Sequence, residues 1–349
     1  CEAFFVLNKC FYLFTFSSKK DNFANSEYNS LKWNHILKLC LIMTEPKKKT
    51  INDNMRRTCF FCSEIIEDKK TQEHIIPDSL LGKLGIKEET ITGKGVFQYS
   101  RVKVPAHKGC NSNFGSEYEN EILKLLDEPE KLFEEIKKEE FGISIIYSPD
   151  NSSTSLISTW LSKIYYGLFY NDYLKIDDLE HKETAEKIIN TDNFRMIQNA
   201  YKDGVGFCLP SSLYVFKSDK DFFDLRTFVY PKMIMIKIKK LVFILAIEDG
   251  FLTKNYLNEE LLSDFRKGLL LEEQSNDKFP LHLYVLAEIM ALRMCIPKTP
   301  SFVYSKKEIM NMSLSTGVKN PDEYYKVDEE LITETRNEIL ESFNVKIKN

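Results

Sequence analysis

The chain has 349 residues, more than the roughly 100–200 of a typical single domain, so one large domain or two smaller ones are expected. Hydrophobic residues make up 43% of it and aromatic residues 13%, which is enough for a buried core, while a negative mean hydropathy argues against a membrane protein. The net charge of −4 excludes a chain that coats nucleic acid by bulk electrostatics, but not one with a local phosphate-binding patch.

The first 42 residues are interpreted as an upstream segment that is non-native or disordered. Their apolar run, from Phe4 to Phe16, has no basic n-region and no small-residue cleavage site, so it does not qualify as a signal peptide. It is also shorter than the ~20 apolar residues of a membrane-spanning helix. Because Met43 precedes a polar, lysine-rich stretch, we expect the natural protein to begin there and to be cytoplasmic, without membrane attachment.

Two short pairs of metal-binding residue types lie between residues 57 and 126. Cys59 and Cys62 are separated by two residues, as are His107 and Cys110. Together they supply the four sulfur and nitrogen ligands of a tetrahedral zinc site, and because four protein ligands close such a site, the zinc is expected to be structural. The alternative is that the two pairs coincide by chance. Eight cysteines are few for a disulfide framework in a chain of this length, which favours reduced thiols in the cytosol.

A further motif lies between these pairs, and another follows them. The segment Glu73–Pro77 reads acid, histidine, two apolar residues and proline, Asn111 follows Cys110 directly, and residues 113–115 read Asn-Phe-Gly. This order resembles that of zinc-containing HNH endonucleases, in particular a subgroup with EHIIP and CN motifs. The resemblance covers residues 57–126 and implies a small treble-clef or ββα-metal module, in which the zinc fixes the start of a helix relative to a pair of strands.

The resemblance also implies a chemistry for three residues. His74 corresponds to the general base that deprotonates a water molecule, a task that suits an imidazole that is neutral near pH 7. Glu73 and Asn111 correspond to oxygen ligands of a catalytic Mg²⁺ or another divalent cation, which would bind the scissile phosphate. The alternative for His74 is a histidine packed on the zinc turn, and for Glu73 a solvated surface acid.

The sequence departs from the family's pattern at two positions. Family members often carry aspartate at the position of Glu73, whose side chain is one methylene longer. The asparagine in the middle of the family motif braces the loop before the final strand, but no asparagine occurs between Cys62 and Cys110. Gln98 or Ser100 could take its place; otherwise activity is expected to be reduced or absent.

Basic residues surround the motifs and could bind the phosphates that flank a cut. Lys108 and Arg101 are the nucleic-acid contacts that we expect. The same group includes Lys83, Lys94 and Lys103. The alternative is a solvated face of mixed charge, because acidic residues lie among them.

Beyond the motifs, two helices are predicted between residues 116 and 140, with an interruption at Pro129. A loop at residues 148–152 marks the expected boundary between the nuclease module, residues 43–147, and a second domain, residues 148–349. That domain opens with a helix whose apolar face is interpreted as core rather than as a nucleic-acid platform. The members of this face are Leu156, Trp160, Leu161, Ile164, Tyr165, Leu168 and Phe169.

The rest of the second domain is predicted to mix helices and strands. An antiparallel sheet is expected from strands at residues 213–216, 233–238 and 241–247, and helices are expected at residues 255–271, 283–295 and 328–343. The predicted fold class is therefore α+β, with a small HNH module followed by a larger α+β domain. No motif in the second domain indicates a chemistry.

These observations predict a metal-dependent endonuclease that cuts DNA, with a second domain that selects the target or a partner. Two alternatives stay open. The first is a zinc module that binds nucleic acid or protein without cutting, which the missing asparagine favours. The second is an RNA-directed nuclease or toxin with the same catalytic residues. A homodimer would supply the two sites that a paired cut requires.

Overall fold

The computed structural model describes residues 6–7, 10–11, 53–67, 71–89, 98–138, 153–191, 194, 198, 201, 212–218, 221, 223–247, 281–295, 301–304, 309–312 and 329–343. Within the first 42 residues these include only the paired strands β1 (Val6–Leu7) and β2 (Cys10–Phe11). The rest of that segment, the predicted loop at 148–152 and the predicted helix at 255–271 lie outside the described residues.

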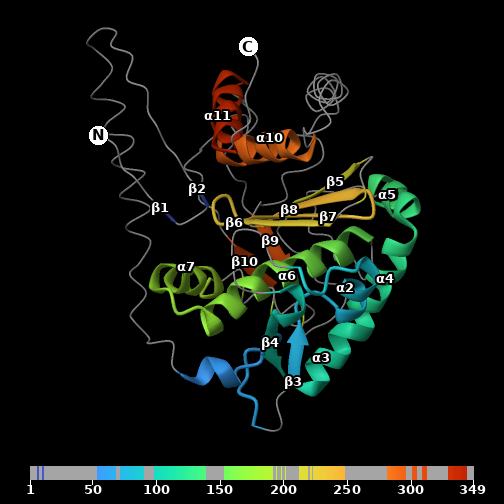
Figure 1. The fold of residues 1–349 in the computed structure, drawn as a ribbon, viewed down its shortest axis with the longest axis vertical. Helices are drawn as coiled ribbons and strands as arrows, with labels where there is room; N and C mark the ends of the chain where they lie inside the picture. Colours follow the sequence, from blue (N-terminus) through green and yellow to red (C-terminus); the bar gives the residue numbers. More distant parts are fainter. Residues whose placement is uncertain are drawn as a thin grey trace.

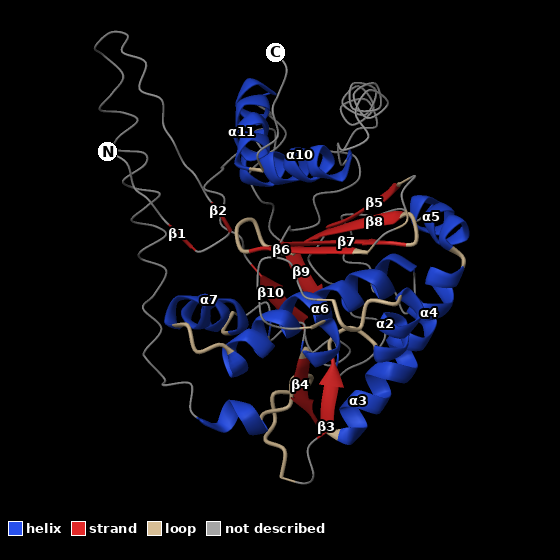
Figure 2. Ribbon diagram, in the orientation of Figure 1, coloured by secondary structure: helices blue, strands red, loops and turns tan. Residues whose placement is uncertain are grey.

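The motif-bearing part of the chain forms a pair of antiparallel strands followed by consecutive helices (Figures 1 and 2). In the pair, Glu73 lies opposite Val104 and His74 opposite Lys103. The elements in chain order are η1 (Asp53–Arg57), β3 (Thr71–His74), α2 (Asp78–Leu84), η2 (Tyr99–Arg101), β4 (Lys103–Ala106), α3 (Lys108–Phe114), the π-helical turn η3 (Gly115–Glu119), α4 (Asn120–Asp127) and α5 (Pro129–Lys138).

Helices α4 and α5 confirm the predicted interruption at Pro129, which is the first residue of α5. Proline suits the first helical position, where its missing N–H has no partner to lose. Both helices are amphipathic, because α4 buries Ile122 and Leu126 and α5 buries Leu132 and Ile136, while charged side chains face outward.

Helix α6 (Ser153–Lys175) runs through the middle of the fold (Figure 1). Its predicted apolar face is buried throughout, which confirms the interpretation as core. The burial extends around the whole helix, because α4 and α5, β4 and the large sheet all contact it. Even the side chain of Lys163, in the middle of α6, is buried.

A four-stranded antiparallel sheet covers one side of α6, in the order β5-β8-β7-β6 (Figure 2). Its strands are β5 (Ser212–Lys217), β6 (Asp224–Phe228), β7 (Met233–Ile238) and β8 (Leu241–Ala246). The three predicted strands and their antiparallel arrangement are confirmed. The sequence did not predict β6, because this edge strand buries only Leu225 and so lacks a clear apolar pattern.

Helices cover both faces of this sheet (Figure 1). Ile234 and Phe243 belong to the core that contains α6, whereas Met235 and Ile244 belong to a second core with the helices beyond the sheet. This division follows from the two-residue period of a strand. The helices beyond the sheet, both predicted, are α10 (Leu281–Cys295) and α11 (Glu329–Ser342). The remaining described elements are α7 (Leu179–Ile189) and the paired strands β9 (Ser301–Tyr304) and β10 (Ile309–Met312).

One core joins the two predicted domains. It contains residues of the first cysteine turn, β4, α6 and one face of the large sheet. The Tyr170 hydroxyl of α6 donates to the carbonyls of Met55 and Thr58, and the Asn171 side chain accepts the backbone N–H of Lys103 at 3.3 Å. The fold is α+β with an antiparallel sheet, as predicted, and the division at residue 148 stays a prediction. In the part of the chain that the structure describes, no helix is long and apolar enough to cross a membrane.

Candidate metal centre

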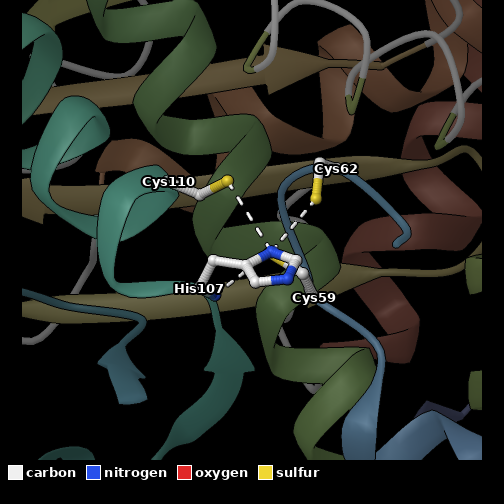
Figure 3. Close-up of side chains that lie close together, drawn as sticks. All are labelled: Cys59, Cys62, His107 and Cys110. Carbon is white, nitrogen blue, oxygen red and sulfur yellow. Dashed lines mark hydrogen bonds between the residues drawn. The ribbon is translucent and has the colours of Figure 1, made fainter. Parts of the chain in front are cut away.

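Four side chains converge on one point beside the start of α3 (Figure 3). The ligand atoms of Cys59, Cys62, His107 and Cys110 all lie within 4.8 Å of one another. His107 Nδ1 lies 3.4 Å from Cys62 Sγ and 4.0 Å from Cys110 Sγ. In a tetrahedral zinc site with bonds of about 2.0–2.3 Å, the ligand atoms lie roughly 3.3–3.8 Å apart. The cluster could therefore hold a metal ion such as zinc, as the spacing predicts.

Two chain segments carry these ligands. Cys59 and Cys62 flank a tight turn in which the Ser63 N–H donates to the Cys59 carbonyl at 2.9 Å, with Ser63 in the left-handed region at φ 61°. His107 directly precedes α3 and Cys110 lies three residues further on, so one helical turn brings both to the same side. The backbone N–H of His107 donates to Cys59 Sγ at 3.4 Å and joins the two segments.

The second ring nitrogen of His107 orients its imidazole. Nε2 lies 3.3 Å from the carbonyl oxygen of Ile65, to which a proton on Nε2 can be donated. This hydrogen bond assigns the tautomer in which the lone pair of Nδ1 faces the sulfur atoms. Metal-binding histidines commonly make such a bond with their other nitrogen, so the arrangement supports the predicted ligand role of His107.

Burial and neighbouring thiols oppose the ionisation of Cys62 and Cys110. Burial raises the pKa of Cys62, and burial together with the neighbouring thiols of Cys59 and Cys62 raises the pKa of Cys110 to about 12. Thiolates that repel one another in this way are stabilised by a bound divalent cation, which displaces their protons. The chemistry of the donor set therefore fits a metal centre.

His74 is the last residue of β3 and is half-buried. Because His74 and Lys103 are directly opposite in the antiparallel pair, their side chains lie on the same face. Burial, and next the charge of Lys103, lower the pKa of His74 below its ordinary value of 6.5. The imidazole is therefore neutral at neutral pH, as a general base must be, and it has no hydrogen-bond partner among the described residues.

Glu73 occupies the other face of β3, with 6% of its surface exposed. Its carboxylate forms an ion pair with the ammonium of Lys163, which also pairs with Glu119. Burial raises the pKa of Glu73, and the charge of Lys163 opposes this. The prediction that Glu73 binds a divalent cation beside His74 therefore finds no support, because a lysine engages its carboxylate. Nor is Glu73 the solvated surface acid of the alternative interpretation.

The other predicted site residues lie on the surrounding elements. Asn111 is half-buried in the first turn of α3, which contacts β3, and its side chain has no hydrogen-bond partner among the residues described. Lys108 is exposed at the start of α3, and Arg101 is exposed at the end of η2. Gln98 precedes η2 and Ser100 lies within it, on the segment that leads into β4.

Sequence reasoning missed Lys163 and Glu119. Lys163 pairs with both Glu73 and Glu119, yet it lies 90 residues from Glu73 and 44 from Glu119 along the chain. One signal was present, since Lys163 interrupts a helix whose other residues are mostly apolar or aromatic. A charged side chain on a helix that is buried all round requires a partner of opposite charge.

No family model matches this chain, and no similar protein was found among curated proteins or solved structures.

Proposed function

We propose that this chain is an endonuclease that hydrolyses phosphodiester bonds in DNA, built on a treble-clef or ββα-metal module of the HNH type. The observation that carries the proposal is the metal cluster. It links the turn before β3 to the first turn of the helix that follows β4, in the order strand, strand, helix. β3, which ends at His74, contacts α3.

The face of the β3–β4 pair that carries His74 supports the chemistry. A neutral His74 imidazole can take a proton from the attacking water, and positioned general bases contribute about 10²–10⁴-fold to rate. The cationic side chain of Lys103 lies on the same face, where it can bind the negatively charged phosphate. Lys108 and Arg101 extend the positive charge to flanking phosphates, and the amide of Asn111 offers a further polar contact.

The resemblance to HNH endonucleases implies two metal ions, and the residues of this chain fit one of them better than the other. A zinc ion would be held by Cys59, Cys62, His107 and Cys110 and would supply rigidity, since four protein ligands leave it no open position. A catalytic Mg²⁺ would require Glu73, whose carboxylate pairs with Lys163 instead. We therefore assign no step to the divalent cation, and its requirement stays a prediction.

A second candidate function is a zinc module that binds nucleic acid or protein without cutting it. The buried pairing of Glu73 with Lys163 favours this candidate, because it removes one predicted ligand of the catalytic cation. The half-buried His74 and the cationic Lys103 beside it favour the enzyme. A nuclease acting on RNA would use the same residues, and a homodimer would be needed only for a paired cut.

The His74→Ala variant tests the proposal. Plasmid DNA, linear duplex DNA and RNA are incubated with wild type and variant at several concentrations of Mg²⁺ and Mn²⁺, and with a weak chelator that leaves structural zinc bound. We expect cleavage of DNA by the wild type and a loss of about 10²-fold or more in the variant, with zinc content unchanged. His181→Ala is the matched control, because His181 pairs with Asp178 at the start of α7, in another part of the fold. Equal cleavage by wild type and His74→Ala, or none by either, would leave the binding module as the better description.

A further inference from the structure

Lys163 is the buried centre of a polar cluster behind His74. Its side chain is 0% exposed, and its ammonium pairs with the carboxylates of Glu73 on β3 and Glu119 at the end of η3. The same nitrogen donates to the backbone carbonyl of His74 at 2.9 Å. Its three N–H donors are therefore directed at three oxygen atoms from two elements, which satisfies the hydrogen-bonding capacity of an ammonium group.

The cluster also reaches the metal centre. The Lys163 ammonium lies 5.1 Å from the centroid of the Phe114 ring on α3, within the range of a cation–π contact. Phe114 stacks on Phe61 with 5.0 Å between ring centroids, and Phe61 lies between the two cysteines of the first turn. One buried cation thus contacts the strand with His74, the π-helical turn, and the aromatic pair beside the metal ligands.

A buried lysine requires strong compensation. Burial acts to lower the pKa of Lys163, but the carboxylates of Glu119 and Glu73 outweigh it and raise the pKa, so the ammonium stays charged. Transfer of one charged group into the interior costs several kcal/mol, and a well-packed apolar side chain would often give equal or greater stability. Stability alone is therefore a weak explanation for three charged groups at this position.

The position of Lys163 next to the backbone of His74 supplies a better explanation. Glu73 and His74 are consecutive, so the contact to the Glu73 carboxylate and the contact to the His74 carbonyl fix the backbone on both sides of the peptide bond between them. The imidazole of His74 then projects from a segment whose backbone cannot shift without breaking one buried and one partly buried hydrogen bond. The cluster lies on the face of β3 that carries Glu73, and the half-buried His74 side chain lies on the other face.

We propose that Lys163 is a positioning residue for His74, which holds Glu73 as its counter-ion in place of a divalent cation and makes α6 part of the catalytic unit. This inference rests on the proposed function. The family resemblance implies that the Glu73 carboxylate binds a metal ion. The inference pairs this carboxylate with the Lys163 ammonium instead.

The experiment compares three variants in the full chain. Lys163→Met keeps the length of the side chain but leaves the buried carboxylate of Glu73 and the partly buried carboxylate of Glu119 without a cation. The triple variant Lys163→Met, Glu73→Gln, Glu119→Gln removes all three charges together, so the cost of unpaired buried charge disappears. Lys217→Met is the matched control, because Lys217 also pairs with a helix carboxylate, Glu130, and lies 4.7 Å from an aromatic ring, Phe133, but on the exposed surface.

Zinc content, thermal unfolding, kcat and KM for DNA cleavage are measured for each. We expect Lys163→Met to lower both Tm and kcat. In the triple variant we expect Tm and zinc content to recover, while kcat stays about 10²-fold below wild type and KM changes little, since misplacement of a catalytic group by about 1 Å costs that much. Lys217→Met should match wild type in all four measurements.

Two results would overturn the inference in different ways. If the triple variant recovers kcat together with Tm, Lys163 has only a structural role, while the proposed nuclease function stands. If the wild-type protein cuts neither DNA nor RNA, the proposed function fails first and the positioning role fails with it. The wild-type assay therefore separates the two failures before any Lys163 variant is considered.

Discussion

The metal cluster and the Lys163 cluster solve the same electrostatic problem in different ways. In each, groups that can carry negative charge converge from separate elements on one point. The buried thiol of Cys59 and the partly exposed thiols of Cys62 and Cys110 need a cation from solution, whereas Glu73 and Glu119 are neutralised by an ammonium of the chain itself. A site whose cation comes from outside can be emptied, and one whose cation is covalently attached cannot. The two clusters can therefore be perturbed independently.

The largest expected effect is loss of the metal ion. Cys110→Ser removes one thiolate, and we expect the purified variant to carry less than stoichiometric zinc and to unfold at a markedly lower temperature than wild type. Structural zinc sites have apparent binding free energies of about 10–16 kcal/mol, far more than a single side-chain contact supplies. The measurements are metal analysis by mass spectrometry and thermal unfolding with and without a strong chelator.

The matched control for that prediction is Cys295→Ser. Cys295 also carries a thiol, but it lies on α10 and contacts Thr335, so its loss should leave the zinc content unchanged. Equal zinc content in wild type and Cys110→Ser, or a Tm that the chelator does not lower, would contradict a structural metal at this cluster.

The next largest effect concerns the approach of α6 to the strand with His74. A Cβ atom on Gly167 would lie 2.1 Å from Ile75 Cδ1 and 2.8 Å from Ile75 Cγ1. Alanine gains about 1 kcal/mol of helix propensity over glycine, but overpacking costs typically about 1–3 kcal/mol and here involves three atoms of one side chain, since Ile75 Cγ2 would also lie 3.0 Å away. We therefore expect Gly167→Ala to lower the free energy of unfolding in urea.

Two further variants test the cause of that loss. Ile75→Val removes Cδ1, so the double variant Gly167→Ala, Ile75→Val should be less destabilised than the sum of the single variants. Gly109→Ala on α3, where a Cβ would meet nothing within 4 Å, should stabilise by up to about 1 kcal/mol. Strict additivity of the first pair would show that the contact between α6 and Ile75 is not the reason.

The difference between the two clusters also explains what the sequence could predict. Cys59 with Cys62 and His107 with Cys110 are pairs at a spacing that a turn or a helix brings together, so local rules suffice to identify them. The same locality holds for the break at Pro129 and for the apolar runs that became β7 and β8. Where residues close together in the sequence determine the structure, as they do here, the prediction is confirmed.

Pairing between residues far apart in the sequence limits what the sequence alone can predict. Lys163, Glu73 and Glu119 come together only because α6 crosses the β3–β4 pair, and nothing in their spacing predicts that crossing. The motif supplied a role for Glu73 as a cation ligand, while its actual partner came from beyond the predicted domain boundary. The weakly patterned edge strand β6 was missed for a related reason, since neighbours in the sheet rather than its own sequence define it.

The smallest expected effect concerns the face of the β3–β4 pair that carries His74 and Lys103. Burial lowers the pKa of His74, and the charge of Lys103 lowers it further, so Lys103→Met should raise this pKa back toward 6.5. A general base acts in its neutral form, so the rate rises with pH through this pKa. The acid limb of the pH–rate profile should therefore lie below pH 6.5 in wild type and at higher pH in the variant.

An NMR titration of the His74 imidazole measures the same shift without any substrate. Lys131→Met is its control, because Lys131 pairs with Glu128 on the exposed surface and should leave His74 unchanged. The lowered pKa also makes stability depend on pH. Because the pKa of His74 is lower in the folded than in the unfolded state, the contribution of His74 to folding stability is present above about pH 6.5 and is lost as the pH falls through the folded-state pKa. An unshifted titration in Lys103→Met would mean that the two side chains do not share a face, and the phosphate contact proposed for Lys103 would lose its geometric basis.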